Sequence, residues 1–432
     1  MERNNSFIFK LFNFGIVAMS MAMVLSLSGC IEEFEADIPA ADSDLLVVEG
    51  TICSGKMNKF TLTRTQDLKT PNTPGIVWGA MVSVRGSDGS EYIAQQFDGY
   101  YPGSGGYYEV TGDYYPGSGG YYPGNGDYNP VTLGSYSCWI DALNPDVEYY
   151  LHIEVDGEVY ESEPQKPLPT EKIAEVRGVQ ETPESNIDVL VTPVAPADPD
   201  KAHYYSWTYD ETWEARADYT TNIFYDIYKK TRVYKYNQFP ERGWKDGTSS
   251  TVMIGASTNY EGQHIERLKL YDIDRSNERM YYRYSALVHQ RAVSKAEYEY
   301  ELAQRQADSE MGGLFTPQPS ALPTNIRCLT SHKRVIGFVG CSLNTSEYRL
   351  FFNGKDFSIY HPIPKDARLW VENPTDVDCR MLVEKGMFLC IWEDKQLTEG
   401  KLITAWATEV QLDVRYKGAY IEKPDFWTDE DE

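Results

Sequence analysis

The residue with the most specific chemistry is Cys30, which ends the motif Leu27-Ser28-Gly29-Cys30. A basic start, an apolar run and small residues before a cysteine are typical of a secreted lipoprotein precursor. The small residues permit cleavage before the cysteine, whose thiol then carries a diacylglycerol. We expect residues 1–29 to be the signal peptide and Cys30 to be lipidated. A transmembrane anchor is the alternative, but the apolar run is shorter than the ~20 residues that a spanning helix needs.

Six further cysteines are candidate disulfide partners: Cys53, Cys138, Cys328, Cys341, Cys379 and Cys390. An even number in an exported chain allows three disulfides, but the sequence does not choose among the pairings. The Lys385-Gly386 turn favours a bridge between Cys379 and Cys390. Zinc ligation is the competing interpretation, and the short Cys and His spacings that it needs do not occur in the chain.

Six histidines are candidate catalytic bases or metal ligands: His152, His203, His264, His289, His332 and His361. They lie outside the motifs of metalloproteases and serine hydrolases, so we interpret them as structural residues. Oxygen-bearing residues alternate over 272–278, but the glycine and distal glutamate of a calcium loop are missing. The sequence therefore predicts no catalytic residue, metal or cofactor. A carboxylate pair for hydrolysis remains open, because its separation in space is not visible in the sequence.

A tyrosine-rich repeat offers the candidate contact residues for a ligand or partner. YYPGSGGYY occurs at residues 100–108 and again at 114–122, within a Tyr/Gly-rich segment over 100–128. The paired tyrosines are Tyr100, Tyr101, Tyr107, Tyr108, Tyr114, Tyr115, Tyr121 and Tyr122. Tyrosines on a glycine-rich loop present flat amphipathic surfaces to a glycan, a peptide or a protein. The alternative is a duplicated insertion that only decorates the surface.

Short alternating segments separated by turns position these residues. Over 44–163 they predict a β-sandwich that contains the repeat as a loop. Gly134-Ser135-Tyr136, the turn at 143–145 and the strand at 149–153 resemble immunoglobulin-like or carboxypeptidase-regulatory-like domains. Residues 30–43 would be the tether between the lipid and this domain.

The proline-rich segment 164–170 predicts a linker to a larger β-rich domain over 171–426, followed by an acidic tail at 427–432. In the strand predicted over 204–215, Trp207 and Trp213 share a face, because an even separation preserves the face of a strand. We expect both to belong to a core. Residues 243–247 are expected to form a turn, and residues 333–341 and 348–353 to close this second domain.

One helix is predicted over about 294–308. Ser294 and Glu297 have the S-x-x-E spacing in which the hydroxyl and the carboxylate each satisfy a free backbone N–H at a helix start. Gly312-Gly313 and the prolines that follow would end the helix. Residues in and after this helix resemble the domain-of-unknown-function 4249 family of Bacteroidetes outer-membrane lipoproteins, namely Ser294, Tyr298, Tyr300, Gly312 to Phe315, Pro317, Pro319, Asn325-Ile326 and Val335 to Val339.

The resemblance implies an outer-membrane protein, lipid-anchored at the cell surface, that accompanies a TonB-dependent transporter in nutrient capture without catalysis. The acidic stretch Ile31 to Asp37 resembles the surface-export signal of such lipoproteins, with a merely solvated tether as the alternative. A formal charge of −25 argues against a nucleic-acid partner. An adhesion or envelope-architecture module and a hydrolase acting on glycan or peptide are the other candidate functions.

Overall fold

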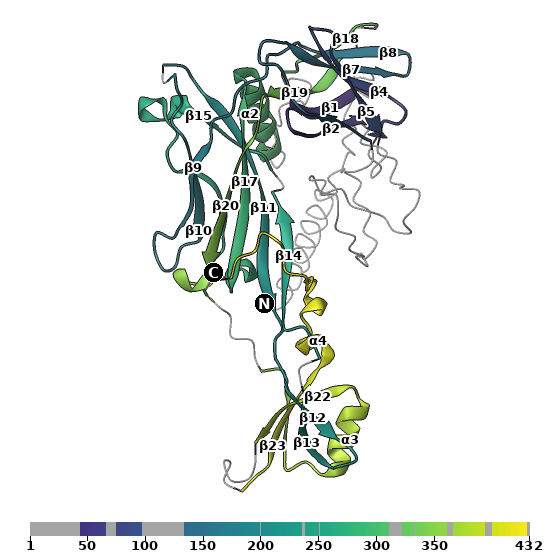
Figure 1. Ribbon diagram of the computed structural model, residues 1–432, viewed down its shortest axis with the longest axis vertical. Coiled ribbons are helices and arrows are strands. Elements are labelled where there is room, and N and C mark those ends of the chain that lie inside the picture. The colour runs from purple at the N-terminus through teal and green to yellow at the C-terminus, as the bar shows by residue number, and fades with distance from the viewer. Residues whose placement is uncertain are drawn as a thin grey trace, which may run out of the picture. The chain divides into compact units, whose positions relative to one another are not determined.

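The computed structural model describes residues 44–65, 75–96, 134–198, 200–235, 238–249, 251–310, 322–331, 333–360, 366–393 and 400–429. These residues belong to one unit that begins at Asp44. Its described part is built mainly from β-strands, which confirms the predicted fold class (Figure 1). Among the described helices, none has both the length and the hydrophobicity needed to cross a bilayer.

Ten strands form the first sheet. They are β1 (Leu46–Cys53), β2 (Lys56–Arg64), β3 (Gly75–Ile76), β4 (Met81–Gly86), β5 (Glu91–Gln96), β6 (Ser135–Ile140), β7 (Tyr149–Val155), β8 (Glu158–Ser162), β18 (Ile326–Cys328) and β19 (Val335–Ser342). Their order is β18-β8-β7-β4-β5-β6-β2-β1-β19, with β3 beside β2. The sheet curls into a nearly closed barrel whose interior holds apolar side chains.

The last two strands correct the sequence interpretation. Residues 333–341 were expected to close the second domain, but β19 pairs in parallel with β1 and completes the first sheet. Gly337 makes this pairing possible, because its φ is +115° and a Cβ there would overlap the carbonyl oxygen of Val48. The first β unit is therefore assembled from two stretches of chain, and sequence alternation alone does not reveal such long-range pairing.

Side chains join the two ends of this sheet near β18 and β19. The amide of Asn325 donates to the carbonyl of Val339 at 2.9 Å and accepts from the N–H of Val339 at 3.0 Å. The hydroxyl of Thr324 donates to the carbonyl of Gly337 at 2.8 Å. An exposed strand edge leaves backbone groups unpaired. These side chains satisfy part of the β19 edge.

Two sheets pack around the second core. One contains β9 (Ile173–Val179), β10 (Ile187–Pro193) and β16 (Leu268–Ile273), and the other β11 (Tyr204–Arg216), β14 (Arg242–Thr248), β15 (Met253–Ala256), β17 (Arg283–Val293) and β20 (Ser346–Asn353). Trp207 is buried in this core and Trp213 packs against it, which confirms that the two tryptophans share a face. The strand predicted at 348–353 is β20, which pairs with β17 as expected for the second domain.

Residues 243–247, expected to form a turn, instead lie within β14. This strand pairs residue by residue with β11. Its glycines serve close packing rather than a turn. A Cβ on Gly243 would lie 2.5 Å from the carbonyl oxygen of Tyr420, and a Cβ on Gly247 would lie 2.9 Å from Oε1 of Glu211.

A third, smaller core lies among elements from two parts of the chain. They are β12 (Ile223–Asp226), β13 (Thr231–Tyr234), β21 (Leu369–Glu372), α3 (Asp376–Glu384), β22 (Met387–Glu393) and β23 (Ile403–Thr408). The helix α4 (Glu409–Leu412) follows, and short 3-10 turns lie at Ser257–Asn259, Glu261–Gln263, Glu278–Met280, Gly354–Asp356 and Val414–Lys417. Trp427, assigned by the sequence to the acidic tail, is 2% exposed and packs edge-on against Trp244 and Phe351.

The predicted helix is present as α2 (Lys295–Glu310), directly after β17. Ser294 accepts a hydrogen bond from the N–H of Glu297 at 3.1 Å, as the capping motif predicts. The carboxylate of Glu297 does not return to the backbone in the predicted way but pairs with Arg291 of β17 at 2.6 Å. The predicted linker is also fixed in place, since Thr170 exchanges hydrogen bonds with Asn344.

Candidate functional site

Two of the predicted sites lie outside the described residues. Cys30 and the eight tyrosines of the repeat fall in residues 1–43 and 97–133. The described chain does show where both segments join it. Residue 43 precedes Asp44 at the start of β1, and residues 97–133 connect β5 to β6.

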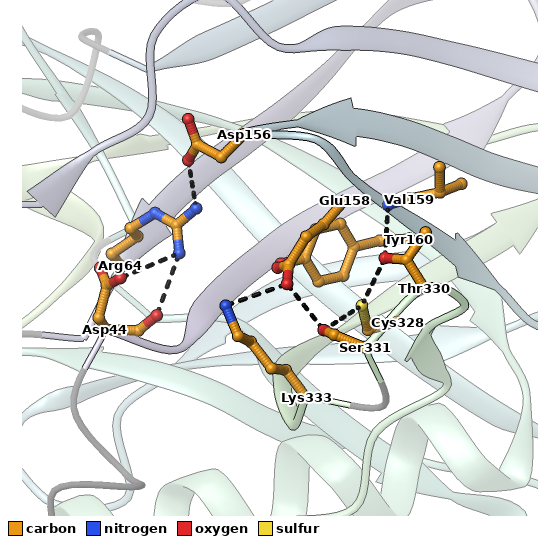
Figure 2. A network of polar contacts seen from close by, with 10 residues as sticks. All are labelled: Asp44, Arg64, Asp156, Glu158, Val159, Tyr160, Cys328, Thr330, Ser331 and Lys333. Atoms are coloured by element: carbon orange, nitrogen blue, oxygen red, sulfur yellow. Dashed lines mark hydrogen bonds and ion pairs between the residues drawn. The ribbon is translucent and has the colours of Figure 1, made fainter.

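A polar network, which we call the root network, lies where the chain enters the first sheet (Figure 2). Arg64, at the end of β2, contacts Asp156 in the β7–β8 turn with Nη2 and Oδ2 2.6 Å apart. The same guanidinium donates to the backbone carbonyl of Asp44 at 3.0 Å and lies 3.6 Å from its carboxylate. Arg64 therefore fixes the first described residue to the first sheet.

Glu158 is the second centre of the root network. Its carboxylate accepts from the hydroxyl of Tyr160 at 2.5 Å, the hydroxyl of Ser331 at 2.7 Å and the ammonium of Lys333 at 3.0 Å. These three bonds lower the pKa of Glu158 to about 2, and burial together with the nearby carboxylate raises the pKa of Tyr160. Glu158 is therefore an ionised acceptor at neutral pH and does not have the pKa of a general acid.

Cys328 ends β18 beside Glu158. Its sulfur lies 3.3 Å from the Ser331 hydroxyl and 3.5 Å from the Thr330 hydroxyl. Burial raises the pKa of this thiol, but hydrogen bonds from those hydroxyls and from the backbone of both residues lower it to about 7. The Cys-Leu-Thr-Ser order is the sequence signal for this site. The thiol is only 4% exposed and contacts two hydroxyls, so it is enclosed rather than open to a reactant.

All six predicted disulfide cysteines are free thiols in the structure. The favoured bridge between Cys379 and Cys390 is not formed. Cys379 packs in the same core as Leu389 of β22, whereas Cys390 is the unpaired residue where the β22–β23 register shifts between Leu389 and Ile391. Burial raises the pKa of both thiols to about 11.

The four described histidines each contact a hydrogen-bonding partner, as expected for structural residues. His152 lies between Glu154 and Glu161, at 2.9 and 2.8 Å. His203 and His264 contact backbone carbonyl oxygens at 2.9 and 3.0 Å. Within the described ranges, no three His, Cys, Asp or Glu side chains are arranged to hold a metal ion.

His289 of β17 is the fourth, and it bridges two carboxylates on the surface of its sheet. Its Nε2 is 2.9 Å from Asp210, and its Nδ1 is 3.1 Å from Glu347. Burial lowers the pKa of the imidazole, but the hydrogen bond and charge of Asp210 and the charge of Glu347 outweigh it and raise the pKa. Both ring nitrogens are engaged, so the arrangement ties β11, β17 and β20 together.

The second core contains a buried ionic network that the sequence did not reveal. Arg279 makes two hydrogen bonds to Glu211, at 2.9 and 2.8 Å. The Tyr284 hydroxyl donates to the same carboxylate at 2.9 Å and lies 2.8 Å from the Tyr271 hydroxyl. Burial raises the pKa of both tyrosines. The carboxylate is saturated by donors, so this network positions strands and does not offer a free catalytic group.

An open depression of about 500 Å³ lies in the loop between β15 and β16. Its lining residues are Tyr260, Glu261, His264, Glu266 and Arg267. The loop has a left-handed backbone at Gln263 and Arg267, with φ of 53° and 52°, and buries Ile265 as its anchor. Its acidic and basic side chains could contact a small polar molecule, but the open shape encloses little of it.

Comparison with known proteins gives one family. The sequence pattern of the family described as "Domain of unknown function (DUF4249)" matches residues 31–348. No curated protein matches the chain.

Proposed function

The chain belongs to the DUF4249 family, and from this premise we propose a non-catalytic, lipid-anchored protein of the outer membrane. It would lie at the cell surface and assist a TonB-dependent transporter in capturing a nutrient, with a glycan or peptide as the candidate ligand. The observation that carries the proposal is the Leu27 to Cys30 motif, placed fourteen residues before Asp44. Acylated Cys30 would be the membrane contact.

The root network supports a tethered arrangement. A force on the tether reaches the folded unit at Asp44, where Arg64 connects the chain start to the β7–β8 turn. Glu158 and Lys333 connect β8 to the segment between β18 and β19. An anchored protein benefits when the first residues after its tether are held by several elements rather than by one strand.

The polar groups described above support a binding role over a catalytic one. Glu158 and Glu211 each accept three hydrogen bonds, and His289 uses both ring nitrogens. A general base needs an acceptor position that a substrate proton can reach. The arrangement of these groups favours positioning of strands.

The anchor is tested by labelling growing cells of the native organism with a fatty-acid analogue. The wild-type chain should incorporate the label and begin at Cys30 by mass spectrometry, whereas Cys30→Ala should not. A mature chain that retains residues 1–29 without an acyl group would contradict the anchor. Protease treatment of intact cells then tests surface display, because a surface protein is degraded while a periplasmic control is protected.

The transporter association has a separate test. The chain should co-purify with a β-barrel transporter from detergent-solubilised outer membrane. The Cys30→Ala chain, which lacks the acyl group, serves as the matched control for chance recovery with membrane fragments. Recovery of the acylated chain without a barrel protein would remove the accessory role while leaving the anchor intact.

A further inference from the structure

The outer face of the first sheet carries exposed apolar side chains on four consecutive strands. Met57 of β2 is 44% exposed, Trp139 of β6 is 52%, Ile93 of β5 is 73% and Met81 of β4 is 65%. Neighbours such as Cys138, Ala94 and Val82 are buried in the core, so alternation directs the exposed set outward. We call Met57, Met81, Ile93 and Trp139 the outer-face patch.

The strand register places the patch residues on neighbouring strands. Met57 and Trp139 are direct partners in the β2–β6 pair, and β5 lies between β6 and β4 in the sheet. Ile93 is opposite Ser83 of β4. Directly paired residues have Cβ atoms about 5 Å apart. An apolar set spread over neighbouring strands is a contact surface rather than a scatter of single exposed residues.

Trp139 is held in one orientation. Its indole N–H donates to Oδ1 of Asp141 at 2.5 Å, so the ring is fixed while about half of the side chain faces solvent. Lys59, two residues from Met57 on the same face of β2, is exposed. Tryptophan beside lysine is the combination found where proteins meet the interface of a bilayer, since the ring has an apolar body and a polar N–H, and lysine reaches the phosphates.

We propose that the outer-face patch docks on the lipid surface to which the chain is tethered. This inference rests on the acylation of Cys30 proposed above. The tether defines the occupant, because its fourteen residues can span at most about 50 Å. Asp44 lies beside Arg64 at one end of β2, and Met57 is seven residues away along that strand, about 23 Å at ~3.3 Å per residue. The patch is therefore within reach of the membrane that holds Cys30.

The two contacts would have different roles. The acyl chains supply attachment, and the patch sets which side of the first sheet faces the lipid. The acyl anchor keeps the patch close to the membrane and so raises the effective concentration of lipid at the patch. A contact that is weak by itself can then form. The β5–β6 connection that contains the tyrosine repeat leaves the sheet between two strands of the patch. Docking there would place both ends of that connection near the lipid surface.

The test measures lipid binding without the anchor. The mature chain with Cys30→Ser is floated with vesicles of phosphatidylethanolamine containing a minor fraction of phosphatidylglycerol. The matched comparison is Met57→Asp/Ile93→Asp against Leu369→Asp/Trp370→Asp, whose original side chains are 44% and 45% exposed on β21. We expect the patch variant to lose roughly tenfold or more of the floating fraction, because aspartate is strongly disfavoured in a bilayer, and the β21 variant to float like the parent.

Thermal unfolding of all variants shows that each is folded before flotation is compared. Equal flotation of the patch variant and the parent overturns the inference, and so does a parent chain that does not float. Loss of self-association or of transporter co-purification, with flotation unchanged, assigns the patch to a protein contact and also overturns it. Acyl labelling of Cys30 separates the two proposals, because a labelled chain without patch-dependent flotation keeps the anchor and loses only the docking face.

Discussion

Arginine–carboxylate pairs occur both in the first β unit, which is the ten-stranded sheet, and in the second β unit, which is the pair of sheets around the second core. The two sets of pairs differ greatly in depth. In the first unit, Arg64 contacts Asp44 and Asp156, whose side chains are 73% and 69% exposed. In the second unit, Arg279 forms an ion pair with Glu211, and their side chains are 21% and 9% exposed. Water screens the first pair and has little access to the second. Ion pairs with similar hydrogen-bond lengths therefore contribute unequally to the free energy of unfolding.

The two units consequently depend on different features. The first unit gains its cohesion from apolar packing and from the close backbone approach of β1 and β19. The second unit includes a buried charge that must stay paired, because an uncompensated buried ion costs several kcal/mol. Substitutions that affect only one of these features sharpen the comparison.

The largest effect is expected from Gly337→Val. The residue would adopt a φ of +115° and overlap the carbonyl oxygen of Val48, so β19 would separate from β1. We expect a loss of roughly 4 kcal/mol or more in the free energy of unfolding, measured by chemical denaturation. Gly386→Val is the matched control, since Gly386 has a φ of +75° but open space around its Cβ position. Equal losses at both positions would contradict the parallel pairing.

Glu211→Gln should have the next largest effect. The change preserves the shape of the side chain but leaves the Arg279 guanidinium without its counter-charge, which costs about 3 kcal/mol for a buried pair. Glu372→Gln is the control, because its partner Lys401 and Glu372 are 55% and 61% exposed and such a pair contributes ~1 kcal/mol or less. Similar losses for the two variants would erase the distinction between buried and exposed pairs.

His289 gives an intermediate case that pH can titrate. Its folded pKa is raised above the ordinary value near 6.5. The contribution of charged His289 to the free energy of unfolding is therefore fully present below about pH 6.5, and it is lost as pH rises through the folded pKa. We expect His289→Gln to cost about 1 kcal/mol or less near pH 5.5 and almost nothing near pH 9.

The pH comparison should stay above about pH 5. For Asp210, burial raises the pKa, but hydrogen bonds from His289 and Thr248 lower it overall. The contribution of this carboxylate is present above its unfolded pKa near 4 and is lost as pH falls through its folded pKa. Unfolding curves of wild type and variant that run parallel across pH 5.5 to 9 would show that the charge of His289 is unimportant.

The smallest effect is expected from Asp156→Asn in the root network. The pair with Arg64 is exposed on the aspartate side, so we expect a loss of ~0.5 kcal/mol that disappears in high salt. Unfolding at low and high ionic strength measures this directly. A loss as large as that of Glu211→Gln would show that the root network is more shielded than its exposure indicates.

Most strands could be predicted because each is a local pattern. The strands predicted at 173–179 and 149–155 are present with those bounds. The helix start at Ser294 was also local, since its cap is made three residues away. The strand β14 was not predicted, because Gly243 and Gly247 are typical of turns. In the structure they are glycines because Tyr420 and Glu211, which are distant in the sequence, pack where a Cβ atom would lie.

The candidate site divides in the same way. The Leu27 to Cys30 motif is contiguous, so the sequence alone specifies the proposed lipidation site. The root network joins residues 44, 64, 156, 158–160, 328, 330, 331 and 333, and no spacing in the chain predicts that these residues meet. The outer-face patch likewise depends on which strands are neighbours.

The sequence by itself determined the β class, the helix, the family resemblance and the Leu27 to Cys30 lipoprotein motif. These features depend on periodicity and on short contiguous patterns. Only the tertiary structure decided that β18 and β19 complete the first sheet, that Glu211 and Arg279 pair in a core, and that Cys379 and Cys390 stay free thiols. The physical reason is that strand pairing and burial are set by contacts between residues distant in the chain. Local alternation predicts a strand but does not identify the strand with which it pairs.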